Sequence, residues 1–193
     1  MFNRVIRAAM LDGELYKEVE ADASLTQEAL IVVILVSVIS SIGGLIVGIM
    51  GGNIGAALIA TVVAIVLGVV NYYIWSYVTY FVGTRMFDGV ADPGELLRVL
   101  GYASGPRLLG VLSFIPCLGG LASLIGALWA LVTGFVAVRE ALDLDTTKTV
   151  FTVVIGWVIV FVISLVIGAV LGTVLGIGAT GMGALGSLLG GGQ

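Results

Sequence analysis

The chain has 193 residues, of which 60% are hydrophobic and only 10% are charged, and its mean hydropathy is +1.21. Soluble domains carry charge on roughly a quarter of their residues, so this composition indicates an integral membrane protein. The chain has no His and one Cys, which excludes Cys/His zinc sites, His-based catalysis and internal disulfides, and its net charge of -4 argues against nucleic acid as a partner.

Residues 1–24 precede the first long apolar run and are predicted to form a cytoplasmic N-terminal segment. An acidic stretch from Asp12 to Asp22 follows Arg4 and Arg7, and we expect no cleaved signal peptide. Apolar residues recur at helical spacing beside the arginines, which favours an interfacial amphipathic helix over the alternative of a disordered tail. These apolar residues are Phe2, Val5, Ile6, Ala9 and Met10.

Five apolar stretches are long enough to cross a bilayer, whose hydrocarbon core of about 30 Å needs about 20 helical residues. They cover residues 25–50, 54–81, 96–115, 118–138 and 150–171. We therefore predict an all-α fold, a bundle of five transmembrane helices that forms one domain over residues 25–171. The Gly-rich residues 172–193 are predicted to be a frayed extension of the last helix or a flexible tail.

The charged residues set the orientation of the five predicted helices. Seven of the eight basic residues and all twelve acidic residues fall in the N-terminal segment or near the second and fourth connections, on one side of the membrane. Lys and Arg near short loops are retained in the cytoplasm, so we expect a cytoplasmic N-terminus, an outer C-terminus and a location in the cell membrane. Only Arg107 departs from this pattern.

Small residues recur every four positions in four of the five predicted helices. Such spacing lets helix backbones approach closely, which matters because lipid provides no hydrophobic force between helices. It predicts a tight bundle, or a homo-oligomer that forms through one of these faces. The series are Gly44, Gly48 and Gly52; Ala56, Ala60, Ala64 and Gly68; Ala122, Gly126, Ala130 and Gly134; and Gly168, Gly172 and Gly176.

Arg107 lies in the middle of the third predicted helix, where an arginine costs about 2.5 to 3.5 kcal/mol on an insertion scale. Asn71 should reach a similar depth on the second helix, and we predict a hydrogen bond between Asn71 and Arg107 that Tyr102 supports. Pro106 lacks an N–H and frees a carbonyl near Tyr102, which is a further acceptor. Two interpretations stay open: a structural arginine that snorkels or binds broken-helix carbonyls, or a site for an anion or a lipid phosphate.

Gly101 and Tyr102, followed after three residues by Pro106, form a GY-x-x-x-P motif. With five predicted spans and a short turn between the third and fourth, the chain resembles a prokaryotic member of the Yip family of Ypt/Rab-interacting multi-pass membrane proteins. The resemblance implies a role in organising membranes, because eukaryotic members are implicated in vesicle traffic and bind prenylated Rab GTPases. Those members carry a D-L-Y-G-P motif that residues 1–24 lack, so GTPase binding does not carry over to this chain.

We expect no enzymatic activity, no cofactor and no metal, because neither a His nor an intramembrane carboxylate is present to activate a nucleophile such as Ser104. The favoured function is a non-enzymatic membrane organiser or scaffold that contacts the lipid bilayer and presents an acidic cytoplasmic face to a protein partner. The alternative is a transporter or channel for anions or lipids, built around Arg107 and Asn71.

Overall fold

The computed structural model describes residues 1–174, which fold into helices joined by short connections. The predicted all-α class is confirmed for these residues, and most of the predicted Gly-rich tail lies outside them. The α-helices are α1 (Phe2–Ala9), α2 (Gly13–Ala21), α3 (Thr26–Met50), α4 (Ile54–Met86), α5 (Pro93–Ala103), α6 (Leu118–Ala141) and α7 (Thr146–Val174), and the 3-10 helices are η1 (Ala23–Leu25) and η2 (Gly105–Phe114).

Four segments of the described chain are helical, long and apolar enough to cross a membrane: Ala23–Met50, Ile54–Met86, Leu118–Ala141 and Thr146–Val170. They agree with four of the five predicted spans. The prediction of one continuous helix over residues 96–115 is wrong, because α5 ends at Ala103 and the chain continues as η2. The cause lies in Pro106, whose ring clashes with the preceding turn and whose nitrogen cannot donate to it.

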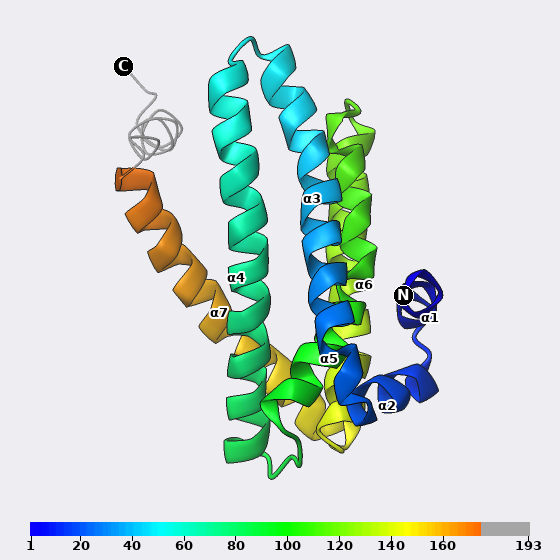
Figure 1. The fold of residues 1–193 in the computed structure, drawn as a ribbon. Helices are drawn as coiled ribbons and strands as arrows, with labels where there is room; N and C mark the ends of the chain where they lie inside the picture. Colours follow the sequence, from blue (N-terminus) through cyan, green and yellow to red (C-terminus); the bar gives the residue numbers. More distant parts are fainter. Residues whose placement is uncertain (175–193) are drawn as a thin grey trace.

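The long helices form antiparallel hairpins, as Figure 1 shows. The tight turns after α3 and after η2 lie at one end of the bundle, and the polar connections before α5 and after α6 lie at the other, beside α2. The 3-10 helix η2 packs between α3 and α6, while α7 packs mainly on α4 and diverges from it along its length. The predicted separation of tight turns from charged connections is therefore confirmed.

The best-packed core lies at the end of the bundle that carries the polar connections. There α5 is enclosed by α2, α3 and α6, and the large side chains of Tyr16, Leu96, Tyr102 and Leu142 are completely buried. Burial of such side chains stabilises a fold by about 1.5 to 3 kcal/mol each when the alternative is water. This core anchors the short helix α5, whose far end opens into the middle of the bundle.

The small-residue series serve two purposes. A Cβ at Gly48 would lie 2.6 Å from the Cβ of Ala57, and one at Gly126 would lie 2.8 Å from the carbonyl oxygen of Pro106, so both glycines permit the predicted close approach. Gly134 and Gly168, by contrast, have open space where a side chain would stand. The spacing therefore produces close contacts at some positions and free volume at others. Gly134 lines the cavity that contains Arg107, and Gly168 lines a separate groove between α4 and α7.

Candidate functional site

The break between α5 and η2 creates the site, because it frees backbone carbonyls and turns the chain into a new direction. The hydroxyl of Thr133 donates to the carbonyl of Ala103 at 2.8 Å, and the hydroxyl of Ser104 donates to the carbonyl of Gly101 at 2.7 Å. Hydroxyl groups thus satisfy the carbonyls at the break, as buried backbone groups require. Arg107 makes no bond to either carbonyl, so it does not have the carbonyl-binding role that was one interpretation.

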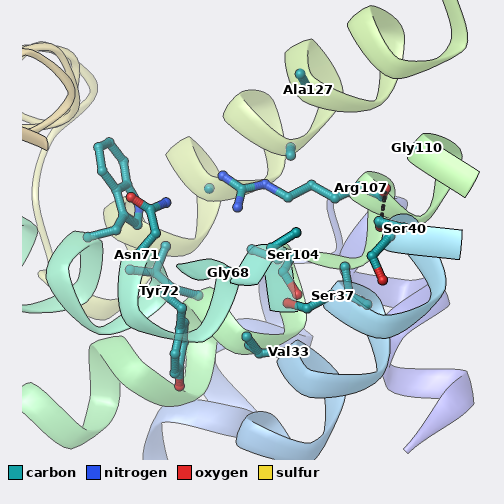
Figure 2. Close-up of a pocket in the computed structure, with 18 of the residues that line it drawn as sticks. Val33, Ser37, Ser40, Gly68, Asn71, Tyr72, Ser104, Arg107, Gly110 and Ala127 are labelled. Carbon is teal, nitrogen blue, oxygen red and sulfur yellow. Dashed lines mark hydrogen bonds between the residues drawn. The ribbon is translucent and has the colours of Figure 1, made fainter. Parts of the chain in front are cut away.

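A cavity of about 490 Å³ lies at mid-bundle between α3, α4, α6 and the α5–η2 break. Figure 2 shows the side chain of Arg107 running across it, from the side of Ser40 toward Asn71. Ser40 donates to the Arg107 carbonyl at 2.8 Å and so holds the backbone of that residue in place. The polar residues in the cavity wall are Ser37, Ser40, Ser41, Asn71, Tyr72, Ser104, Arg107 and Ser123.

The guanidinium of Arg107 forms no hydrogen bond or ion pair with any described residue. The predicted hydrogen bond to Asn71 is therefore wrong, although both side chains line the same cavity as their similar depth suggested. The amide of Asn71 and the hydroxyls of Ser37 and Ser123 are likewise without hydrogen bonds inside the described part of the chain. An unpaired cation surrounded by free donors is an arrangement that can receive an anion.

Tyr102 does not belong to this cavity, and its predicted support of Arg107 is wrong. Its side chain is fully buried and points to the first long helix, where its hydroxyl donates to the carboxylate of Glu28 at 2.6 Å. Glu28 also forms ion pairs with Arg4 at 3.0 Å and with the amino group of Met1 at 3.1 Å. Tyr102 therefore links α5 to α3 and to α1, away from the cavity.

The remaining motif residues explain how α5 docks. A Cβ at Gly101 would lie 2.8 Å from the Cβ of Ala29 and 3.0 Å from its carbonyl oxygen, so only glycine allows α5 to approach α3 this closely. Pro106 then ends the α-helix at the level of the cavity. The GY-x-x-x-P motif thus supplies a close contact, a polar anchor and a helix break in consecutive turns of the chain.

Arg98 is a second polar centre, although its position next to the second connection suggested only a loop charge. It is 6% exposed, its Nε donates to the carbonyl of Val19 at 3.1 Å, and its Nη2 donates to the carbonyl of Glu20. Both acceptors lie in the last turn of α2, where cations are favoured by the exposed carbonyls and the helix dipole. The available signal was the capping box of Asp92 and Glu95 with Pro93 at the first helical position, which starts the helix before Arg98 and so makes Arg98 part of a helix and not of a loop.

Glu20 shares this region and has an unusual environment. One of its carboxylate oxygens is buried without a hydrogen-bond partner among the described residues. Burial, followed by the negative charges of Asp143, Glu95 and Glu140, raises the pKa of Glu20 to about 7, and Lys17 opposes the shift. This carboxyl group therefore titrates near neutral pH.

Comparison with known proteins gives one match. The family model described as the Yip1 domain matches residues 13–169, which is more than half of the chain and includes the motif and the cavity. No curated protein sequence and no solved structure matches the chain. The family match and the four long apolar helices together identify the chain as a multi-pass integral membrane protein that belongs to the Yip family.

Proposed function

We propose that this protein is a non-enzymatic membrane protein that binds anions at Arg107 and acts in the handling or transport of anions or lipids. The observation that carries the proposal is the free guanidinium, which lies in a cavity of about 490 Å³ without a partner among the described residues. A charged side chain at this depth is expensive, and in membrane proteins such residues usually mark substrate or ion pathways. A cavity of this volume is in the range that holds small ligands.

The donors around Arg107 suit an anion better than a cation. The guanidinium offers several N–H groups in one plane, which match the oxygen atoms of a phosphate or carboxylate. Asn71, Ser37 and Ser123 can add donors from α4, α3 and α6. No group in the cavity wall can act as a general base toward Ser104, which supports binding over catalysis.

We further propose that α5 and η2 together make a fifth crossing of the cell membrane. The segment begins at the polar connection before α5 and ends at the tight turn after η2, and these lie at opposite ends of the bundle. Five crossings with a cytoplasmic N-terminus put every charged connection in the cytoplasm and the C-terminus outside. Irregular backbone at membrane depth is tolerated here because η2 packs between α3 and α6 and part of it lines the cavity.

Flux measurements in proteoliposomes test this function. Purified protein would be reconstituted, and efflux of small anions and exchange of labelled lipids would be compared between the natural protein and an Arg107→Leu variant. Arg85→Leu is the matched control, because Arg85 is exposed at the end of α4. Flux that is lost in the Arg107 variant and retained in the control supports the proposal, and the absence of Arg107-dependent flux overturns it.

The thermal stability of the same variants distinguishes a binding arginine from a structural one. An unpaired charge at mid-membrane depth costs free energy, so Arg107→Leu should raise the midpoint of unfolding in detergent. A structural arginine would behave in the opposite way, since its loss would remove stabilising bonds. A lower midpoint for Arg107→Leu than for Arg85→Leu would therefore count against an anion site.

An organiser or scaffold is the second candidate, and the two acidic connections favour it. The N–H of Val90 donates to the carbonyl of Leu142 at 3.1 Å, and Lys148 donates to the carbonyl of Phe87 at 3.2 Å, so the connections form one ordered surface. A protein partner held there by charge should dissociate as ionic strength rises. Capture that is independent of salt would exclude this mechanism.

A further inference from the structure

Two further spaces lie between the Arg107 cavity and the α4–α7 face of the bundle. Arg107 and Asn71 also line a cavity of about 210 Å³ whose outer wall is formed by α7. Asn71 and Ser164 in turn line a groove of about 390 Å³ on the α4–α7 face. All three spaces are lined by Asn71, so they adjoin one another in a row from the polar cavity to the α4–α7 face. Figure 1 shows α7 diverging from α4 on this side.

The chemistry changes along this path. Its inner end carries Arg107 and free hydroxyl groups, whereas its outer wall is aliphatic and aromatic, with Trp157 and Phe161 stacked at 5.5 Å and each about half exposed. Gly168 in the outer wall has nothing within 4 Å of the place where its side chain would stand. Asn71 and Ser164 are the polar side chains in the lining of the α4–α7 groove, so it offers little to an aqueous ion. A molecule with a charged head and apolar chains would contact a polar surface at one end and an apolar surface at the other.

We propose that the Arg107 cavity binds the phosphate of an anionic phospholipid that enters sideways between α4 and α7. The phosphate accepts hydrogen bonds from Arg107 and Asn71, and the acyl chains lie in the α4–α7 groove beside Gly168. This inference rests on the proposed anion site and adds the source of the anion. Inorganic phosphate from water would form the same hydrogen bonds with Arg107 and Asn71, but it has no acyl chains to occupy the apolar groove.

Two of the three tryptophans provide a direct assay. Trp75 and Trp157 line the lateral cavity, so brominated acyl chains in the groove would quench their fluorescence. Trp129 lies elsewhere, against the carbonyl of Ala9, and would be replaced by Phe in every sample. The protein would be placed in phosphatidylcholine nanodiscs that contain a small fraction of brominated phosphatidylglycerol or, for comparison, brominated phosphatidylcholine.

We expect brominated phosphatidylglycerol to quench more strongly than brominated phosphatidylcholine at equal mole fraction. Phosphatidylcholine carries the same phosphate, but Arg107 repels its choline cation. Arg107→Leu should therefore reduce the relative affinity for phosphatidylglycerol by about tenfold or more, because the charge that distinguishes the two headgroups is lost. Gly168→Leu should reduce it by filling the groove while leaving Arg107 in place. Gly55→Leu is the matched control, since Gly55 also has open space but lies at the far end of α4.

Calorimetric titration with inorganic phosphate tests the anion site independently of the lipid proposal. Equal quenching by the two lipids, together with Arg107-dependent phosphate binding, would overturn the lipid proposal and leave the anion site intact. Equal quenching without phosphate binding would overturn both. Enrichment of phosphatidylglycerol that depends on Arg107 and on Gly168, but not on Gly55, would establish the lipid site. Circular dichroism of each variant checks that the helices are retained.

Discussion

Replacement of Arg98 by Met should release α2 from the bundle. Arg98 is buried and holds the last turn of α2 through the carbonyls of Val19 and Glu20. Methionine fills a similar volume but offers no donor, so both carbonyls lose their partner. The sequence places Arg98 and Val19 79 positions apart, and their contact therefore exists only in the folded chain.

The expected magnitude follows from the number of bonds and their burial. A hydrogen bond from a charged group contributes about 1.5 to 3 kcal/mol, and Arg98 makes two such bonds to α2, besides a weak one of 3.5 Å to Thr26 on α3. The Val19 carbonyl is buried, whereas the Glu20 carbonyl is partly exposed and can be reached by water. We therefore expect α2 to lose about 3 kcal/mol of local stability, which corresponds to faster opening by a factor of about a hundred.

Hydrogen exchange measured by mass spectrometry on the protein in nanodiscs tests this value. Amides of α2 should exchange about a hundredfold faster in Arg98→Met, while amides of α4 should be unchanged. Arg98→Lys keeps the charge but only one donor atom, so we expect an intermediate rate. Arg85→Met removes an exposed arginine from the same end of the bundle and should have no effect. An exchange rate in Arg98→Met within fivefold of the natural protein would refute the reasoning.

Three further changes test the docking of α5 and the environment of Glu20. Gly101→Leu should lower the unfolding midpoint through a clash with Ala29, at a cost of about 1 to 3 kcal/mol, measured by thermal unfolding in detergent. Tyr102→Phe removes the bond to Glu28 and should cost about 1 to 2 kcal/mol in the same assay. Glu20 has a folded-state pKa of about 7 against 4.5 for a free side chain, so its ionisation destabilises the fold as pH rises through this interval. Glu20→Gln should therefore raise the unfolding midpoint at pH 8 and change it little at pH 4.5.

Each of these changes has a matched control. Gly120→Leu adds the same side chain where nothing lies within 4 Å, and an equal loss of stability would contradict the steric argument for Gly101. Tyr77→Phe removes a hydroxyl from an exposed tyrosine on α4, and Tyr102→Phe should be clearly more harmful. Glu14→Gln removes an exposed carboxylate from α2. The unfolding midpoints of Glu14→Gln and Glu20→Gln should therefore change differently with pH.

Much of the architecture could be predicted from the sequence because the bilayer restricts the choices. Hydrocarbon offers the backbone no hydrogen-bond partner, so a long apolar stretch must be helical, and its length follows from the membrane thickness. The helix bounds at Met50, Ile54 and Leu118 accordingly agree with the prediction. Depth in the membrane can also be counted from the helix ends, which is why Arg107 and Asn71 were correctly expected at one level.

The tertiary structure decided which groups meet. Tyr102 contacts Glu28 and not Arg107, and Arg98 contacts α2, and these partners are more than 70 positions away in the sequence. The break after Ala103 was signalled by Pro106, but whether hydroxyl groups or Arg107 would satisfy its carbonyls depended on the position of α6 and its Thr133. Local sequence determines the length and polarity of a helix, whereas the free guanidinium and its cavity result from how separate helices pack.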